Sequence, residues 1–493
     1  MKYVEKEIER ADFKPKICTW TSPLGDEYNL KIPNTVYPPR EDTDLLAKTL
    51  ISFNSGPGRK LLEIGSGSGV ISIFAKKLGW DVVGCDINPL AVAGSRGLAE
   101  EYNVENIEFI EGGIEPKSEQ SEKIFEKGPF DLILWNLPYL EKPNKNELLG
   151  PLEDASLSNI GEQKLHEVLL KKIESEQSLS PEGGVILIHN DIGSGRMLTS
   201  ECRKLGWACK SINNKILEDG ERLHATLIWK PWQSIQKIEL LEVESTNTYL
   251  LDGAFPRGTF ATTKKQTKGR GQRKNEWVQF KGGWCGSWVI PLEKSSPQLI
   301  QAKAALAVIE SIAAINGDEL PTFDYLAMAK FLQNKISIKW PNDLLIGDKK
   351  FSGILCEAKT TGKETICVIG IGCNLRNETG EIRSKFPNAT SLAELKNISD
   401  QEWSNILHAS MASKFQTQDS LKLDNNSEII KNWWLSMQNY NKNHFVIINS
   451  KRYKINELLA DGELNLISSK NYLNSKTKFS VSYDLEWEKI LFD

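Results

Sequence analysis

The sequence predicts an α/β fold in which a doubly wound sheet is followed by an α+β domain and a small β-barrel. The length indicates several domains, since 493 residues exceed the roughly 250–300 at which single cores stop growing. The first half alternates apolar strand-like runs with helical patterns, which is typical of doubly wound sheets. From about residue 235 the pattern changes to unevenly spaced strands around one Ala-rich helix.

The first predicted domain spans residues 1–231. Its strands are expected at 60–64, 81–85, 107–110, 130–135 and 184–189, with a closing strand at 224–229. Helical stretches separate these runs, so the strands should form a parallel sheet that binds ligands at its carboxyl edge. Pro231 then ends the pattern, because proline interrupts a sheet ladder.

Two further domains are expected at 232–440 and 441–493. The first should hold strands at 239–243, 284–292, 336–340 and 366–371, and helices after a cap at 245–247 and over 297–316. The tail from Phe445 has short alternating runs with turn residues at Asp461 and Gly462, which suggests a small β-barrel.

Composition limits the function classes. No apolar run approaches the roughly 20 residues of a membrane span, and the first ten residues lack an apolar signal region, so a cytoplasmic protein is expected. A formal net charge of −4 argues against a general nucleic-acid binder, and neither DNA nor membrane is predicted as a partner. The 8 cysteines are scattered, so we expect reduced thiols and no metal site made by protein alone.

A glycine-rich turn follows the strand at 60–64. Gly65, Gly67 and Gly69 open a helix, and Asp86 ends the next strand, where an acid can accept hydrogen bonds from ribose hydroxyls. The GxGxG spacing favours S-adenosylmethionine over a dinucleotide, which would bring a pyrophosphate to the turn. A tight strand-to-helix turn without ligand is the plainer alternative.

The tetrapeptide Asn136-Leu137-Pro138-Tyr139 ends the strand at 130–135, beside the expected cofactor face. The side-chain carbonyl of Asn136 and the next backbone carbonyl can accept hydrogen bonds from a planar amino group, on which Tyr139 can stack. Fixing such a weak nucleophile in line with a sulfonium methyl catalyses by orientation. An ordinary strand-ending turn is the alternative.

Residues 36–229 therefore resemble the amino-methyltransferases, most of all those that methylate a glutamine of translation release factors. The segment 36–43 matches the upstream signature of that class. The resemblance implies a Rossmann-like fold, S-adenosylmethionine as cofactor and a release factor as partner. Carried over by motif, the cofactor-binding residues are Glu41, Thr43, Glu63, Gly65, Gly67, Gly69 and Asp86.

Two departures qualify this resemblance. The family usually carries an acid near the adenine after the third strand, where this chain has Glu111-Gly112-Gly113. The Asn-Leu-Pro-Tyr form also occurs in rRNA adenine dimethyltransferases, so the motif leaves glutamine and adenine open. The upstream signature favours glutamine. A catalytically silent binding module remains an alternative.

The second half carries a loop, Gly269 to Trp277, that combines glycines, arginines and an indole. Glycine lets the backbone close on a bound molecule, and Arg270 and Arg273 offer planar forks suited to carboxylate and phosphate. Lys339-Trp340-Pro341-Asn342-Asp343 forms a second cationic element. Taken alone, the loop could be a solvated turn, and the Lys339 element could be the end of a strand. Together they suggest an adenylating enzyme.

Residues 235–377 resemble biotin protein ligases through five motifs in family order. These are Ser245-Thr246-Asn247, Gln266 with the loop from Gly269 through Gly271 to Trp277, Lys339 to Leu344, Lys350 with Gly353 to Leu355, and Gly370 to Asn374 with Gly372 at its centre. The resemblance implies that biotin and ATP form biotinyl adenylate and that the biotinyl group passes to a lysine of a carrier domain.

The resemblance also implies residue roles. Lys339 would bridge the carboxylate and the α-phosphate, Arg270 and Arg273 would close over the adenylate, and Mg²⁺ would offset pyrophosphate charge. Trp277 would flank adenine, and Asn342 and Asp343 would orient the nucleotide or its metal. Ser245, Thr246 and Gln266 would bind the ureido head of biotin, while Asn247, Gly269, Gly271, Lys350, Gly353, Gly370, Gly372 and Asn374 would complete the biotin and ATP site.

Some points stay open at this stage. Gln272 stands where the family often has arginine, and Lys274 replaces a glycine, so adenylate leakage can differ from that of other members. Lipoate is an alternative to biotin, since the two ligase families share a fold. The resemblance further implies that two chains can pair through the catalytic sheet.

Overall fold

The chain divides into two compact units with a boundary between Lys230 and Pro231, and each is described by itself. The computed structural model describes residues 16–33, 35–53, 55–115, 118–138, 164–191, 193–218, 220–272, 275–290, 297–317, 331–332, 335–362, 364–378, 380–416, 426–468, 476–478 and 485–489. Two predicted site residues, Tyr139 and Arg273, lie outside these described residues.

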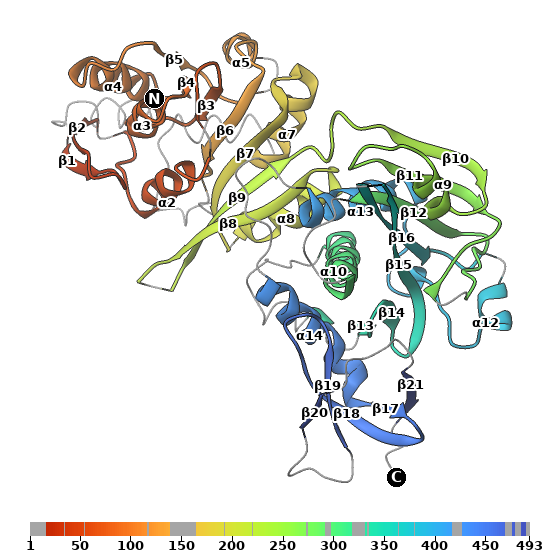
Figure 1. The fold of residues 1–493 in the computed structure, drawn as a ribbon. Coiled ribbons are helices and arrows are strands. Elements are labelled where there is room, and N and C mark those ends of the chain that lie inside the picture. The colour runs from red at the N-terminus through yellow and green to blue at the C-terminus, as the bar shows by residue number, and fades with distance from the viewer. Residues whose placement is uncertain are drawn as a thin grey trace, which may run out of the picture. The chain divides into compact units, whose positions relative to one another are not determined.

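The N-terminal unit is built on a seven-stranded sheet with strand order β5-β4-β3-β6-β7-β9-β8 (Figure 1). Its strands are β3 Lys60–Ile64, β4 Asp81–Asp86, β5 Ile107–Glu111, β6 Phe130–Asn136, β7 Leu179–Asn190, β8 Ala208–Ile216 and β9 Arg222–Trp229. The predicted α/β fold is confirmed, with one difference. Strand β9 runs antiparallel to both neighbours, because only the short turn around Glu218 to Glu221 joins it to β8.

The central strands β3 and β6 are buried on both faces, as the continuous apolar runs predict. In β6 every residue except Asp131 and Asn136 is buried. The helices of this unit are α2 Glu41–Leu50, α3 Val70–Lys77, α4 Pro89–Glu101, α5 Glu119–Phe125, α7 Leu165–Glu176, the 3-10 turn η1 Gly193–Met197 and α8 Leu198–Lys204. A hairpin of β1 Lys16–Thr21 and β2 Glu27–Ile32 precedes them and was not expected from the sequence.

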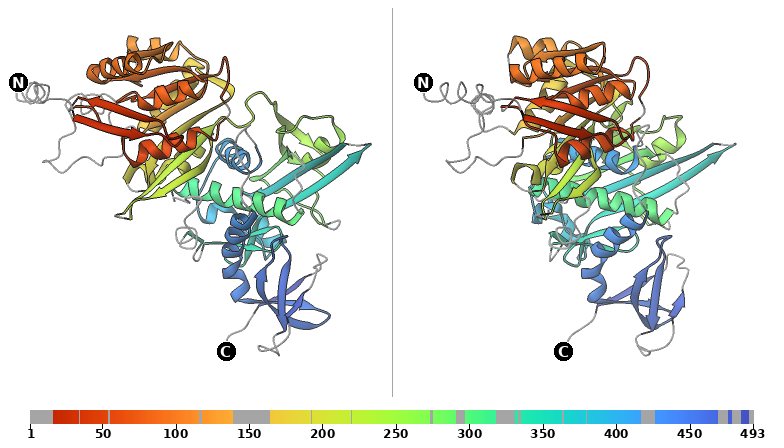
Figure 2. Two further views of the ribbon diagram at one scale, coloured as in Figure 1. Left: turned by 60° about the vertical axis from the view of Figure 1, so that its left-hand side comes forward. Right: turned by 90° about the vertical axis from the view of Figure 1, so that its left-hand side faces the viewer.

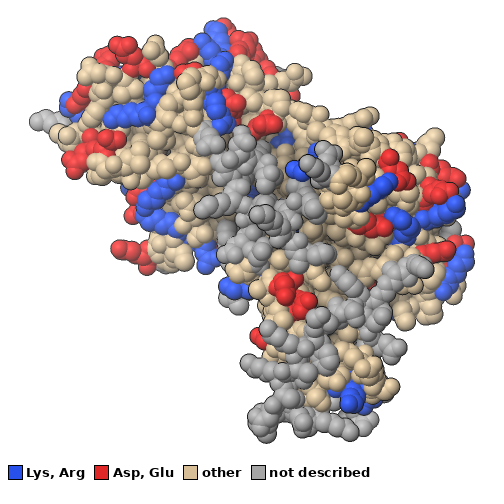
Figure 3. Space-filling model, in the orientation of Figure 1, with Lys and Arg blue, Asp and Glu red and all other residues tan. Residues whose placement is uncertain are grey.

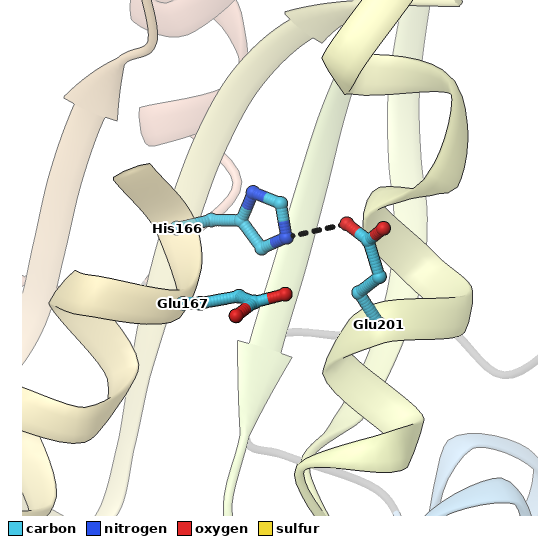
Figure 4. A group of neighbouring side chains, drawn as sticks. All are labelled: His166, Glu167 and Glu201. Carbon is cyan, nitrogen blue, oxygen red and sulfur yellow. Dashed lines mark ion pairs between the residues drawn. The ribbon is translucent and has the colours of Figure 1, made fainter. Parts of the chain in front are cut away.

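Helices α7 and α8 are joined by a cluster of ionisable side chains (Figure 4). His166 Nε2 lies 2.8 Å from Glu201 Oε2, and the ligand atoms of His166, Glu167 and Glu201 lie within 4.8 Å of one another. Such a set can hold a metal ion. However, Lys164 pairs with Glu201, and Lys171 Nζ lies 3.8 Å from Glu167, so lysines already balance both carboxylates. We interpret the cluster as an ion-pair network that ties the two helices together.

The C-terminal unit contains a second seven-stranded sheet, with strand order β10-β11-β12-β16-β15-β14-β13. Its strands are β10 Lys237–Val243, β11 Phe260–Gln266, β12 Gly283–Ile290, β13 Ile336–Lys339, β14 Asp343–Ile346, β15 Lys349–Thr361 and β16 Glu364–Asn374. All neighbours pair antiparallel except β10 and β11. The long hairpin of β15 and β16 is seen in Figure 2.

The helices of this unit are α9 Thr246–Asp252, α10 Pro297–Asn316, α12 Glu381–Lys385, the 3-10 turn η3 Leu392–Glu394, α13 Asp400–Phe415 and α14 Asn426–Lys442. Helix α10 has the bounds that the sequence predicts. Its stretch Gln298–Asn316 is long and apolar enough to cross a membrane, so the expectation that no apolar run approaches such a span was wrong. It is nevertheless 94% buried within the protein, as a core helix is, and it packs against α13 and α14.

The chain ends in a five-stranded antiparallel sheet of order β20-β19-β18-β17-β21, as expected for a small barrel. Its strands are β17 His444–Ile448, β18 Lys451–Leu458, β19 Leu464–Ser468, β20 Lys476–Lys478 and β21 Glu486–Lys489. The predicted turn holds Gly462 at φ 86°, and its carbonyl accepts a hydrogen bond from Trp340 Nε1 at 3.2 Å. This bond ties the small sheet to the end of β13, inside the same compact unit.

Candidate functional site

A cavity of about 170 Å³ lies in the C-terminal unit, at the start of α9 and against strands β15 and β16. Most ligase-type residues predicted from the sequence line it, although they come from five separate segments of the chain. The predicted residues in its wall are Ser245, Thr246, Asn247, Gln266, Arg270, Gly271, Trp277, Asn342, Asp343, Lys350, Gly353, Gly370 and Gly372.

The floor of the cavity is polar and held in place by hydrogen bonds. Ser245 caps α9, and its hydroxyl accepts from the Thr248 backbone N–H at 3.5 Å. The Thr246 backbone N–H donates to Gln266 Oε1 at 3.0 Å. Ser287 Oγ lies 2.7 Å from Thr246 Oγ1, within hydrogen-bond distance. These contacts hold a row of buried donors and acceptors ready for a polar ligand.

Asn247 occupies the centre of this floor. Its Oδ1 lies 2.6 Å from Ser287 Oγ, and its Nδ2 donates to Glu357 Oε2 at 2.8 Å. A Cβ atom added at Gly370 would lie 2.1 Å from Asn247 Oδ1, so only glycine lets the amide sit there.

The glycine and arginine loop folds back on itself over the cavity. Gly271 N–H donates to Asn275 O at 2.7 Å, and Trp277 N–H donates to Gly269 O at 2.9 Å. Arg270 Nη2 reaches across to Glu357 Oε2 on β15 at 2.7 Å. The loop therefore places one arginine at the cavity through an ion pair with the sheet.

The indole of Trp277 fills part of the cavity. A Cβ at Gly372 would lie 2.3 Å from the ring, and Lys350 Nζ lies 5.5 Å from the ring centroid. The indole N–H is buried without a hydrogen-bond partner among the described residues. Ligand sites usually measure roughly 300–1,000 Å³. The volume of this cavity is smaller, because the Trp277 indole occupies part of the space.

Charged groups gather at the β13–β14 turn. Lys350 Nζ and Asp343 Oδ1 form an ion pair at 2.6 Å in the cavity wall, and Asn342 Nδ2 donates to Ile354 O at 2.7 Å. Lys339 lies opposite Asp343 in the strand ladder but does not itself line the cavity. Burial lowers the pKa of Lys339, while nearby Asp343 raises it and Lys350 lowers it further.

Two other predicted residues also lie outside the wall. Gly269 packs under the Trp277 carbonyl, which would lie 2.1 Å from a Cβ there. Asn374 is buried, and its Nδ2 donates to Thr390 O at 3.1 Å. Both residues support the loops that form the cavity.

The glycine turn of the N-terminal unit follows β3, where the sequence places it. Asp86 accepts hydrogen bonds from Gly67 N–H and Asn88 N–H, each at 2.8 Å. The upstream segment lies against the turn, since a Cβ at Gly67 would be 3.8 Å from Tyr37 O. Burial raises the pKa of Asp86, while the two backbone donors lower it.

Asn136 stands at the carboxyl end of β6, and its Oδ1 is buried with no hydrogen-bond partner in the described part of the chain. The next residue is anchored, because Leu137 N–H donates to Ile188 O at 3.0 Å. Pro138 follows as the last described residue of the motif. A buried oxygen without a donor is costly, so the site suits a ligand that brings an N–H group.

The two upstream residues begin helix α2. Thr43 Oγ1 accepts from the Arg40 backbone N–H at 3.2 Å and so caps the helix, while Glu41 is exposed. A second acid lies near the glycine pair 112–113. A Cβ at Gly113 would be 3.3 Å from both Glu115 carboxylate oxygens, one of which is buried without a described partner.

Comparisons with known proteins match both units. A biotin/lipoate A/B protein ligase family model matches residues 241–374, and a methyltransferase domain model matches residues 55–238. The chain joins a methyltransferase domain to a biotin/lipoate ligase domain. The predicted fusion is thereby confirmed.

Similar proteins exist for each domain. Biotin--protein ligase 2 of Arabidopsis thaliana is 31% identical over 153 residues, covering 31% of this chain and 41% of that protein. Ribosomal protein L11 methyltransferase of Thermus thermophilus is 32% identical over 168 residues, covering 31% and 63%. A structure of biotin protein ligase from Aquifex aeolicus in complex with biotin and ATP is 23% identical, with a TM-score of 0.40, over 52% of this chain and 99% of that one.

The chain thus spans about two fifths of the length of this plant ligase.

On the face seen in Figure 3, acidic and basic side chains are interspersed on each unit, without a broad field of one sign.

Several residues of the ligase domain site were not predicted from the sequence. Glu357 is the main one, and the signal was available: it is the only charged residue in the run from Phe351 to Ala358. Ser287, a small polar residue in the buried strand β12, likewise marks a hydrogen-bonded position. In the methyltransferase domain Glu115 was missed, because it follows the glycine pair rather than ending the strand.

Glu63 in the methyltransferase domain should make stability depend on pH. Burial raises its pKa to about 8; the hydrogen bond from Ser72 lowers the pKa and Asp86 raises it. In the unfolded chain the carboxyl titrates near 4.3. Between these values the folded state holds a proton that the unfolded state has lost, so the stability of the ligand-free domain falls as pH rises.

Glu63→Gln stays neutral and should remove this slope. Because each unit of pKa shift corresponds to about 1.4 kcal/mol, the variant should melt several degrees above wild type at pH 8 and close to it at pH 5. Scanning calorimetry of the full chain measures this, with the exposed Glu105→Gln as control. Equal pH dependence in wild type and Glu63→Gln would contradict the prediction.

Proposed function

We propose that the ligase domain joins biotin to ATP as biotinyl adenylate and then transfers the biotinyl group to a lysine of a carrier domain. The observation that carries this proposal is the single cavity that unites Ser245, Arg270, Asn342, Lys350 and Gly372. A polar floor, a cationic loop and an indole meet there. A carboxylate and a triphosphate need such surroundings to react.

The first step brings two anions together. A carboxylate oxygen of biotin attacks the α-phosphorus of ATP, and the bond to pyrophosphate breaks. Arg270 on the loop and Lys350 in the wall offset the charge on the phosphoryl oxygens, and Lys339 joins them if it turns toward the cavity. In the second step the carrier amine attacks the acyl carbon, and AMP leaves.

Mg²⁺ belongs to this proposal as the counterion of pyrophosphate. Asp343 is a carboxylate in the cavity wall, a donor type that Mg²⁺ prefers, and Asn342 adjoins it. When bound, the ion would supply positive charge to the leaving group, while Asn342 and Asp343 would orient it.

The cavity favours biotin over lipoate. The ureido head of biotin offers two N–H donors and a carbonyl, which suit the hydroxyls and amides of Ser245, Thr246, Asn247 and Gln266. The dithiolane of lipoate offers no such groups and would gain no hydrogen bonds from these residues. Incubation with ATP, Mg²⁺, a carrier domain and either labelled acid tests the choice. Labelling by lipoate alone, or by neither acid, would overturn the assignment.

We propose further that the methyltransferase domain transfers a methyl group from S-adenosylmethionine to a planar amino group held at Asn136. Its residues fit the cofactor: Asp86 can accept from ribose hydroxyls, and the buried Glu63 and the buried Oε2 of Glu115 suit hydrogen-bond donors or positive charge. The cofactor supplies the methyl group. The chain's own contribution is to orient the acceptor nitrogen through the unpartnered Asn136 Oδ1.

A release-factor glutamine remains the proposed acceptor, on the basis of the upstream segment 36–43. The Thermus thermophilus relative is named for ribosomal protein L11, and that protein is the natural competitor in the assay. Mass spectrometry of release factor, L11 and rRNA after incubation with the chain tests the acceptor. Methyl transfer to L11 or rRNA alone would replace the proposal, and no cofactor binding in calorimetry at millimolar concentration would favour a silent module.

A further inference from the structure

A single carboxylate oxygen links the glycine and arginine loop of the ligase site to its floor. Glu357 Oε2 accepts one hydrogen bond from Arg270 Nη2 at 2.7 Å and another from Asn247 Nδ2 at 2.8 Å. Arg270 belongs to the loop, and Asn247 belongs to the first turn of α9. Glu357 itself stands on β15, beside the cavity-lining Leu355.

The two partners of Glu357, Asn247 and Arg270, differ in how firmly the protein holds them. Asn247 is fixed, since Ser287 holds its Oδ1 and Gly370 leaves no space behind it. The Arg270 side chain is 44% exposed and that of Glu357 25%, so the ion pair lies at the solvent boundary of the cavity. An exposed pair of this kind is weak enough to be remade when a ligand arrives.

Arg270 therefore has two possible anionic partners in one cavity. Its guanidinium can pair with Glu357 or with the carboxylate or phosphate of a ligand, and the negative charge of Glu357 weakens the second choice. The other polar groups of the wall do not pair with Glu357. Lys350 pairs with Asp343, and Asn342 donates to Ile354 O.

We propose that Glu357 is a positioning residue that limits how tightly Arg270 holds the anionic adenylate. This inference rests on the proposed ligase function. In the free enzyme Glu357 holds Arg270 in an ion pair. With adenylate bound, Glu357 and the adenylate compete for the same guanidinium.

The test is the rate at which biotinyl adenylate leaves the full chain. Glu357→Gln keeps the length of the side chain and an acceptor for Asn247 but removes the competing charge. Release should slow by about two- to fivefold, the range expected for a partly exposed ion pair. Transfer to a carrier domain should slow by a similar factor. Glu239→Gln, an exposed acid on β10 of the same sheet, is the matched control and should leave both rates unchanged.

A double-mutant cycle separates this role from a structural one. Arg270→Gln should speed release of the adenylate. Adding Glu357→Gln to it should not change the rate further, because no guanidinium is left for which Glu357 and the adenylate compete. Faster release in Glu357→Gln, an unchanged rate, or additive effects in the double variant would each overturn the inference while leaving the ligase function intact. A wild-type chain that forms no adenylate from biotin and ATP would overturn both.

Discussion

Lys339→Ala is expected to lower the rate of biotinyl adenylate formation by about 10²–10³-fold, the cost of removing one group that stabilises charge in a transition state. Lys339 ends β13 beside the two charged residues of the cavity wall, Asp343 and Lys350. Its flexible stem can carry the ammonium from the described position to the reacting phosphate. Release of labelled pyrophosphate with biotin and ATP measures the rate.

The control for this prediction is Lys349→Ala, which removes an exposed lysine one residue away from Lys350. Its rate should match wild type, and the methyltransferase domain should stay folded in both variants. Because burial lowers the pKa of Lys339, wild-type activity should also decline at a lower alkaline pH than an exposed lysine would cause. If adenylate accumulates normally in Lys339→Ala and is lost in Lys350→Ala, the cation is Lys350.

Asn136→Ala is expected to reduce methyl transfer by at least about 10²-fold while S-adenosylmethionine still binds with wild-type affinity. The substitution removes the buried, unpartnered Oδ1 that would accept from the amino group of the acceptor. The glycine turn and Asp86 are untouched, so the cofactor keeps its contacts. Methyl transfer is followed with labelled cofactor, and cofactor affinity by calorimetry.

Asn214→Ala on β8 provides the matched control, since it removes an exposed asparagine side chain in the same domain. It should change neither quantity. A large loss of cofactor affinity in Asn136→Ala would instead place Asn136 among the cofactor contacts. Methyl transfer at the wild-type rate would show that the acceptor is held elsewhere.

Local pattern was sufficient for most of the fold. The strand runs were found because buried strands are continuous apolar segments, and α10 was found because its composition leaves no alternative to a helix. The antiparallel course of β9 and the hairpin of β1 and β2 were missed, as were strands β8, β11, β14 and β15. Strand direction depends on how the chain returns to the sheet, and short alternating segments near a terminus have little signal of their own.

Ligand chemistry was also readable in the sequence, because it depends on residue types at short spacing. Glycines after a strand, an amide before a proline, and paired arginines in a loop each indicate a chemistry whatever surrounds them. For this reason the motifs around Gly65, Asn136, Arg270 and Asn342 predicted which groups would serve each site.

Only the tertiary structure decided which of these groups meet and what else meets them. It left Lys339 out of the cavity wall and placed Lys350 in it, and it filled the space between Gly353 and Gly372 with the Trp277 indole. It also brought Glu357 to Arg270 across 87 positions of sequence. The sequence by itself determined the two chemistries, since these reside in side chains. Their balance of charge and space depends on contacts between distant segments, which no local pattern encodes.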